Sequence, residues 1–302
     1  MTADLACEML SKVGVHFAPT EVRVDERDER WLVRLPDARL AWFAASDEGA
    51  LRLKTERRVL RLLHARCTFG VPRVLLEDAT GEFDVRAMVA GEGDPRRIYA
   101  GVRDSVEVAT FIGKAVGKIL AEQHSKIALA DVAEWLPRTP SWPRSRTWVA
   151  ERLTAVVNDP ELLSAADAVT RAYENLRVLE TDRVLVHSDV GLHNLAIDAG
   201  THAVQGLFDY EDAAWADRHH DFRYLVFDGD RYDLLNAAVS VYEPATGHTI
   251  QRDRVLLYNA ACALTYLAFR ADKPPDERSC GRTLAEDLHW SRIAIARAVP
   301  SR

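Results

Sequence analysis

The sequence predicts an α+β protein of two lobes, a small β-rich N-terminal lobe over residues 1–90 and a larger helical lobe over residues 91–302. Before residue 90 the apolar residues mostly follow the short alternating runs that are typical of strands. After residue 105 they recur mostly at helical spacing. A glycine-containing stretch at residues 88–94 separates the two patterns, so the hinge between the lobes is expected there.

The N-terminal lobe is expected to contain strands and one helix. Alternating or strand-like runs predict strands at residues 21–24, 30–35, 39–44, 72–76 and 83–89. The second and third runs are close enough to form a hairpin around Pro36-Asp37. The helix is predicted to begin at Ser46 and to continue to about His64, because serine followed by two acidic residues favours a helix start.

The second lobe is expected to be mainly helical, with one short strand at residues 183–186. Helical patterns occupy residues 106–123, 148–157, 160–179, 219–240, 252–271 and 282–298. This order, strands first and helices afterwards, is what assigns the chain to the α+β class.

Composition excludes several classes of function. The 302 residues are 48% hydrophobic and 28% charged, as in ordinary globular proteins. A net charge of −7 argues against a nucleic-acid partner, because such proteins usually carry a basic surface. No apolar run approaches the roughly 20 residues of a membrane helix, and the N-terminus lacks the order of a signal peptide. The four cysteines are scattered, which predicts reduced thiols in a cytoplasmic protein.

Residues 184–212 contain the side chains with the clearest chemical meaning. An apolar strand leads to His187 and Asp189, Asn194 follows five residues later, and a second apolar run ends at Asp209. Phosphoryl transfer needs one carboxylate that orients the attacking hydroxyl and accepts its proton. It also needs oxygen ligands, such as an amide and a second carboxylate, that hold Mg²⁺ against the nucleotide phosphates.

This stretch resembles the catalytic signature of the aminoglycoside phosphotransferase and choline kinase family. His187-Ser-Asp189-Val-Gly-Leu-His-Asn194 is similar to the family's His-Gly-Asp-x-x-x-x-Asn, and Asp209-Tyr-Glu211 to its Asp-Phe/Trp-Glu/Asp. Trp215-Ala-Asp217-Arg-His-His-Asp221-Phe222 resembles its Gly-Asp-Pro-x-x-Asp-Leu, and Leu120-Ala-Glu-Gln-His124 its Leu-Ala-x-Leu-His. The resemblance covers roughly residues 20–245 in the right order.

The resemblance implies a protein-kinase-like fold and a small-molecule kinase that uses Mg²⁺ with ATP or GTP. It implies that Asp189 is the catalytic carboxylate and that Asn194 and Asp209 bind the metal. His187 either takes part in catalysis or braces the loop through hydrogen bonds. His193, between Asp189 and Asn194, is expected to be exposed or structural.

The nucleotide site is only partly visible in the sequence. In the resembling family a basic residue on the third strand pairs with a helix glutamate and holds the phosphates. Glu56 fits the glutamate, but Trp42 or a neighbour stands where the basic residue belongs, and Arg34 is the first substitute. Met88 and Val89 are expected to bind the nucleobase through their backbone, which does not separate ATP from GTP. The absent strand lysine keeps open a catalytically weak nucleotide-binding regulator of the same fold.

Acidic residues cluster after Asp209, where the resembling family binds its acceptor. The cluster suggests a cationic hydroxylated substrate such as an antibiotic, or equally a solvated acidic face. The candidate substrate-binding residues are Glu211, Asp212, Asp217 and Asp221. A protein kinase is disfavoured, because the chain has no Asp-Phe-Gly, no Ala-Pro-Glu and little sequence for an activation loop. The sequence indicates no oligomeric state.

Overall fold

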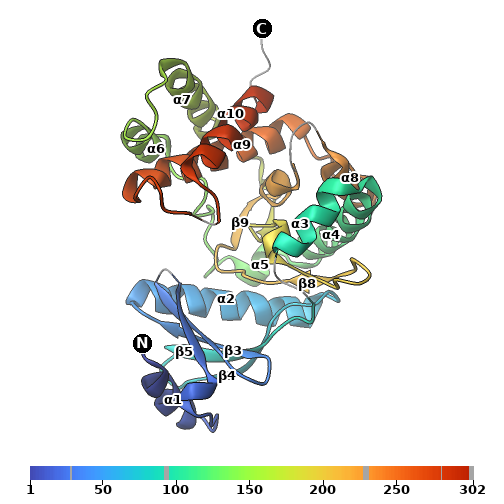
Figure 1. Ribbon diagram of the computed structural model, residues 1–302. Helices are drawn as coiled ribbons and strands as arrows, with labels where there is room; N and C mark the ends of the chain where they lie inside the picture. Colours follow the sequence, from blue (N-terminus) through green and yellow to red (C-terminus); the bar gives the residue numbers. More distant parts are fainter. Residues whose placement is uncertain (28, 92–94, 227–230, 280, 299–302) are drawn as a thin grey trace.

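The computed structural model describes residues 1–302 except 28, 92–94, 227–230, 280 and 299–302, and it has two lobes (Figure 1). The N-terminal lobe contains a five-stranded antiparallel sheet with the strand order β1-β2-β3-β5-β4. Its elements are α1 (Ala3–Ser11), a 3₁₀ helix (Pro19–Glu21), β1 (Arg23–Arg27), β2 (Arg30–Arg34), β3 (Arg39–Ala44), α2 (Asp47–Arg66), β4 (Arg73–Glu77) and β5 (Phe83–Ala87). Helix α2 lies between this sheet and the second lobe (Figure 1).

The strand register places three notable side chains on one face of the sheet. Arg30 lies opposite Ala44, Trp42 opposite Leu32, and Arg86 opposite Leu40. Cross-strand partners share a face, and so do residues two apart on a strand. Arg30, Trp42 and Arg86 therefore project from neighbouring strands in the same direction.

The start of α2 packs closely against the turn that precedes β2. Ser46 caps the helix by accepting a hydrogen bond from the Gly49 backbone N–H. A Cβ atom on Gly49 would lie 2.0 Å from the carbonyl oxygen of Glu29. Glycine is thus required at this close approach, which fixes the first residues of β2 beside the helix.

The C-terminal lobe is mainly helical, with two small two-stranded sheets, β6 with β9 and β7 with β8. Its α-helices are α3 (Pro95–Asp104), α4 (Val106–Lys126), α5 (Leu129–Val132), α6 (Arg146–Leu153), α7 (Pro160–Glu174), α8 (Asp233–Thr246), α9 (Arg252–Phe269) and α10 (Leu284–Ala298). Its strands are β6 (Arg183–Val186), β7 (Leu195–Ile197), β8 (Val204–Leu207) and β9 (Ala214–Asp217). Further 3₁₀ helices cover Glu180–Asp182, Leu192–Asn194, Arg218–Leu225 and Arg270–Asp272. The α+β prediction of a β-rich lobe followed by a helical lobe is confirmed, while the division at residue 90 stays a prediction.

One predicted helix is wrong. Residues 219–240 contain the 3₁₀ helix Arg218–Leu225 and the start of α8 at Asp233, with 227–230 outside the described residues. Every residue from Arg218 to Arg223 is buried, so the segment has no solvent-facing side. Polar side chains here bind buried partners, and the spacing of the apolar residues therefore does not mark an amphipathic α-helix.

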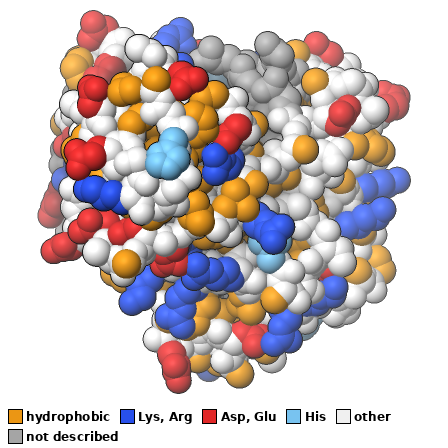
Figure 2. All heavy atoms as spheres, turned by 90° about the horizontal axis from the view of Figure 1, so that it is seen from below, with side chains coloured by type: hydrophobic (Ala, Val, Ile, Leu, Met, Phe, Trp, Pro, Cys, Tyr) orange, Lys and Arg blue, Asp and Glu red, His pale blue; other side chains and the backbone are white. Residues whose placement is uncertain are grey.

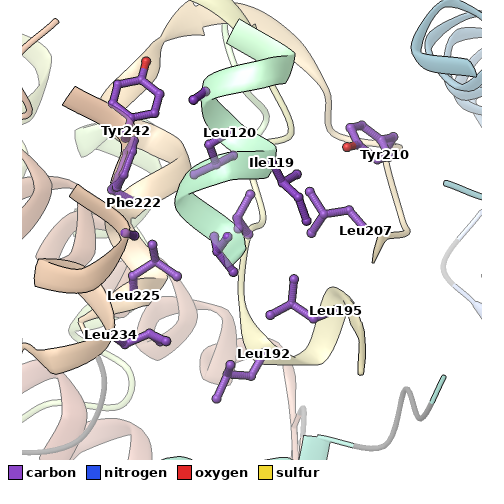
Figure 3. Close-up of a cluster of buried hydrophobic side chains, with 14 of the residues drawn as sticks. Ile119, Leu120, Leu192, Leu195, Leu207, Tyr210, Phe222, Leu225, Leu234 and Tyr242 are labelled. Atoms are coloured by element: carbon purple, nitrogen blue, oxygen red, sulfur yellow. The ribbon is translucent and has the colours of Figure 1, made fainter. Parts of the chain in front are cut away.

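The largest hydrophobic core joins the two lobes. It includes Val59 and Leu63 of α2 together with residues of α4, β7 and α8. In Figure 3, Ile119 and Leu120 of α4 lie between Leu207 on one side and Phe222 on the other. The core thus supports both the segment before Asp209 and the segment that follows β9.

The face of the molecule seen from the N-terminal lobe carries side chains of mixed character (Figure 2). On the face seen from the N-terminal lobe, acidic and basic side chains both occur, with apolar side chains between them (Figure 2). Within the described ranges, no helix has the length and apolar character needed to cross a bilayer. Cys7, Cys67 and Cys262 are free thiols, and Cys280 lies outside the described residues.

Candidate active site

Asp189, Asn194 and Asp209 lie together at the end of β6 and β8. The loop after β6 carries Asp189, and the 3₁₀ helix Leu192–Asn194 turns the chain back toward it. The Asn194 side-chain Nδ2 donates to the backbone oxygen and to Oδ2 of Asp189, both at 2.9 Å. Since both bonds use the amide nitrogen, Oδ1 of Asn194 is the atom that could bind a cation.

Asp189 is ionised and keeps one oxygen without a partner. Burial opposes its ionisation, but the charge and hydrogen bond of His193 and the charge of Arg223 lower the pKa of Asp189 to about 2. Its Oδ2 is 3.1 Å from Nε2 of His193 and also accepts from Asn194. Its Oδ1 is buried and has no hydrogen-bond partner in the described part of the chain. An ionised oxygen of this kind is an acceptor for a hydroxyl proton.

His193, which was expected to be exposed or structural, forms an ion pair with Asp189. Burial disfavours the imidazolium, but the ion pair with Asp189 raises the pKa of His193 above its ordinary value. The ring folds back over Gly191, where a Cβ atom would lie 2.3 Å from its Cε1. A side chain at position 191 would therefore displace the imidazole from its place beside Asp189.

His187 braces the loop. Its Nε2 is 2.9 Å from the carbonyl oxygen of Phe208, and its Nδ1 is 3.2 Å from the backbone nitrogen of Asp189. A carbonyl only accepts and an N–H only donates, so the ring is the neutral tautomer protonated at Nε2. His187 is fully buried. Of the two roles expected from the sequence, this geometry fits the bracing role.

Asp221 binds the backbone of the same loop. The expectation that it contacts substrate is wrong. Its side chain is fully buried. Its two oxygens accept the backbone N–H groups of His187 at 3.0 Å and Ser188 at 2.8 Å. Nε2 of His124 lies 3.0 Å from Oδ2. Burial would raise the pKa of Asp221, but these hydrogen bonds lower it, so the carboxylate is ionised and structural.

Asp217 is also a structural residue and not a substrate contact. Its side chain is 1% exposed and binds His219, Tyr258 and Arg254. Burial opposes ionisation, but these partners lower the pKa of Asp217 to about 2. The sequence alone does not distinguish such buried carboxylates from exposed ones, because their partners come from α9 and from the 3₁₀ helix that follows β9.

Ser188 has a strained backbone that its neighbours hold on both sides. Its φ of 72° lies in the left-handed region, which a side chain disfavours. Its N–H donates to Asp221, and its carbonyl accepts from Nη2 of Arg223. The resembling family usually has glycine at this position, which has no such steric cost.

A group of carboxylates surrounds Asp209. Burial and the negative charges of Glu56 and Asp189 raise the pKa of Asp209 to about 6. Burial and the charge of Asp209 raise the pKa of Glu211 to about 8. Acidic groups crowded in this way favour either a bound proton or a bound cation.

These residues fit Mg²⁺. An amide oxygen of Asn194 and a carboxylate of Asp209 are oxygen ligands of the hard kind that Mg²⁺ prefers. Among the described residues there is no group of three or more His, Cys, Asp and Glu that could enclose a metal. Mg²⁺ usually keeps waters and binds substrate phosphates beside one or two carboxylates, so a complete protein cage is not needed.

Glu56 is paired as expected, but Arg34 is the wrong partner. Arg34 pairs with Asp25 at 3.1 Å, and its side chain is 45% exposed. Instead Nη1 of Arg86 lies 2.8 Å and Nη1 of Arg30 lies 3.5 Å from the Glu56 carboxylate. Burial would raise the pKa of Glu56, but the charges of Arg86 and Arg30 lower it. The sequence did not single out either arginine, because Arg86 lies on β5 and Arg30 begins β2, at the other end of that strand from the Arg34 that was expected.

The remaining predicted residues lie near this region. Met88 directly follows β5 and its side chain is exposed, with Val89 next to it. Glu211 forms an ion pair with Nη2 of Arg30, which joins the C-terminal lobe to β2. Asp212 accepts a hydrogen bond from the Ser141 hydroxyl. Part of the hinge predicted at 88–94 lies outside the described residues.

Comparisons with known proteins agree with this geometry. Residues 12–253 match the model of a family described as the phosphotransferase enzyme family. Among curated proteins, none matches the sequence significantly.

Solved structures share the fold. The GDP complex of aminoglycoside 2'-phosphotransferase-IIIa is 16% identical, with 98% of each chain covered and a TM-score of 0.71. An aminoglycoside phosphotransferase bound to GDP and kanamycin is 16% identical, with 97% of this chain and 95% of that chain covered and a TM-score of 0.68. The macrolide 2'-phosphotransferase MphH from Brachybacterium faecium is 15% identical, with 99% of each chain covered and a TM-score of 0.64. At such identities the likeness establishes the kinase-like fold alone.

Proposed function

Because the chain belongs to the phosphotransferase enzyme family, we propose that it transfers the γ-phosphoryl group of ATP or GTP to a hydroxyl of a small molecule. The observation that carries the proposal is the state of Asp189. This carboxylate is ionised, two neighbours hold its Oδ2, and its Oδ1 has no partner in the described structure. One oxygen is thus held in place while the other is available to an acceptor hydroxyl.

The reaction assigns a limited task to Asp189. The acceptor oxygen bonds to the γ-phosphorus while the bond from that phosphorus to the bridging oxygen breaks, and ADP or GDP leaves. The hydroxyl proton passes to Oδ1 of Asp189. Since the transition state of phosphoryl transfer is loose, orienting the hydroxyl matters more than removing its proton early. A carboxylate with a pKa of about 2 suits that task, because it orients the hydroxyl without being a strong base.

Asn194 and Asp209 would hold Mg²⁺ in this proposal. When bound, the ion would neutralise charge on the nucleotide phosphates. The hydrogen bonds from Nδ2 of Asn194 to Asp189 fix the amide so that its oxygen is the free end. The backbone of Met88 and Val89 would bind the nucleobase, and it admits adenine or guanine.

For the acceptor we propose a hydroxylated antibiotic or a similar small molecule. Support comes from solved structures of this fold that are described as a kanamycin complex and as a macrolide phosphotransferase. Of the four predicted substrate residues, Glu211 and Asp212 remain candidates because they are partly exposed. Ser141, which binds Asp212, is followed by Trp142, whose ring stacks on Tyr266 at 4.8 Å. An amine and a ring of the acceptor could therefore be recognised side by side.

The test is transfer itself. Purified protein with Mg²⁺ and either ATP or GTP is screened against aminoglycosides, macrolides, peptide antibiotics, nucleosides and amino alcohols, with the phosphorylated product detected by mass spectrometry. Asp189→Asn keeps the size of the side chain but removes the charge, so we expect turnover to fall by roughly 10²–10⁴-fold. Asp276→Asn, at an exposed position, is the control and should keep full activity. Turnover of Asp189→Asn within a few-fold of the parent would refute the catalytic assignment.

A second candidate function is a catalytically weak nucleotide-binding regulator. The observation that favours it is Trp42 on β3, near the position where the resembling family has its basic residue. The regulator predicts nucleotide binding without transfer to any member of the panel. The same screen therefore separates the two candidates.

A further inference from the structure

The sheet carries a buried cation close to the position that Trp42 occupies. The guanidinium carbon of Arg30 lies 4.5 Å from the centre of the Trp42 ring. Arg30 is on β2, adjacent to the strand that holds Trp42. Its side chain is only 3% exposed. An arginine stacked on an indole is held with its donors in one plane, a geometry suited to phosphate oxygens.

Arg86, the other arginine beside Glu56, has a carboxylate partner at each of its nitrogens. Its Nε and Nη2 bind the two oxygens of Asp84 at 2.6 and 3.0 Å. Its Nη1 is 2.8 Å from Glu56. All three nitrogens thus have carboxylate partners inside the N-terminal lobe, so Arg86 has a structural role as the anchor of Glu56.

Arg30, in contrast, has spare donors. Nε and Nη1 of Arg30 are buried without a hydrogen-bond acceptor among the described residues. Leaving charged donors buried without a hydrogen-bond acceptor is costly, so these two nitrogens can take acceptors from a ligand. Nη1 is 3.5 Å from Glu56, and Nη2 is paired with Glu211.

The position of Arg30 connects the predicted metal site to the sheet. Its partner Glu211 lies two residues after Asp209. A phosphate bound to a metal at Asp209 would therefore lie near the guanidinium of Arg30.

We propose that Arg30, on β2, is the cation that binds the nucleotide phosphates in this protein, in place of a basic residue on β3. Glu211 and Glu56 hold the guanidinium. Phosphate oxygens supply acceptors for Nε and Nη1, and Glu56 keeps the side chain in position through Arg86 and its own contact. The proposal rests on the nucleotide-dependent function proposed above and assigns one residue of that site.

The test measures nucleotide affinity and not turnover, because affinity isolates the phosphate contact. Binding of ADP, GDP, adenosine and guanosine is measured by calorimetry in the presence of Mg²⁺, for the parent, Arg30→Met and Arg30→Lys. Arg34→Met is the matched control, since Arg34 lies on the same strand but pairs with Asp25 away from the site. Circular dichroism and melting temperature check that each variant is folded. If Arg30→Met does not fold, Arg30→Lys, which retains the charge, still tests the contact.

We expect a loss of affinity for the nucleoside diphosphates and not for the nucleosides. Arg30→Met should weaken binding of the preferred diphosphate by about 10- to 100-fold, the scale of a charge-assisted hydrogen bond, and change nucleoside affinity less than about twofold. Arg30→Lys should lose less, and Arg34→Met nothing. If Arg30→Met and Arg30→Lys bind the diphosphate as the parent does, the assignment of Arg30 is overturned while the nucleotide-dependent function stands. If the parent binds neither diphosphate, the proposed function fails, and this inference fails with it.

Discussion

Replacing Asp221 with asparagine tests how the loop that carries Asp189 is held. Asp221 is fully buried and its two oxygens serve different partners. Oδ2 accepts from the His187 backbone at 3.0 Å and lies 3.0 Å from His124, and Oδ1 accepts from the Ser188 backbone at 2.8 Å. Asparagine offers one acceptor oxygen and one NH₂ group. If the asparagine oxygen takes the Oδ2 position, the NH₂ group takes the Oδ1 position. It then faces the Ser188 N–H, and two donors oppose each other.

The magnitude follows from these contacts. A hydrogen bond to a charged group contributes about 1.5–3 kcal/mol, and an unsatisfied buried donor costs about 1–3 kcal/mol. The left-handed backbone of Ser188 also loses one of its two restraints. We therefore expect Asp221→Asn to lower the free energy of unfolding by roughly 3–5 kcal/mol, the usual result of breaking a buried charged network.

The assay is urea denaturation of Asp221→Asn beside the parent and Asp276→Asn, the exposed control, which should change stability by less than about 0.5 kcal/mol. The pKa of Asp221 is lowered in the folded protein, so its contribution is complete above the unfolded pKa of about 3.9 and declines as the pH falls through the folded value. The difference between parent and variant should be full at neutral pH and shrink in acid. A loss below about 1 kcal/mol at neutral pH would refute the structural role.

Three further substitutions extend the test. Ser188→Gly should raise the melting temperature by a few degrees with turnover unchanged, because glycine adopts the φ of 72° without strain; a lower melting temperature contradicts the strain. Asp209→Ala should abolish transfer yet stabilise the protein near pH 7. The pKa of Asp209 is about 6 in the folded protein, above the unfolded value, so the parent loses stability as the pH rises from about 4 to 6. Equal transfer by Asp209→Ala and the parent would disprove the metal assignment, and equal pH profiles of their melting temperatures would disprove the raised pKa. Gly117→Ala should destabilise by about 1–3 kcal/mol, because its Cβ would lie 2.3 Å from the carbonyl oxygen of Ala238 where α4 meets α8; calorimetric melting at or above the parent temperature would show that the helices can separate freely.

The sequence predicted that Asp189 and Asn194 lie together because the geometry that joins them is local. Asp189 and Asn194 are five residues apart, and a short 3₁₀ turn suffices to bring the amide to the carboxylate. The strand before them was recognisable as a short apolar run. The two-lobe order was equally visible, since strands and helices leave different periods in the sequence.

The same local reasoning failed where a long-range contact decides the role of a side chain. Asp217 and Asp221 look like their acidic neighbours in the sequence, but their partners lie on other elements, so only the fold shows that they are buried. The helix predicted at 219–240 was wrong for the same reason. Apolar spacing carries no information about polar side chains that are paired inside the core.

What the sequence by itself determined is the set of residue types that short-range geometry brings together, above all Asp189, Asn194 and the strand that ends near Asp209. Only the tertiary structure decided which arginine stands beside Glu56. Arg30 and Arg86 reach it from β2 and β5 because the sheet order β1-β2-β3-β5-β4 places both strands next to β3. Strand pairing joins residues that are far apart in the chain. A basic side chain on a neighbouring strand can therefore reach Glu56 without any local pattern in the sequence that indicates it.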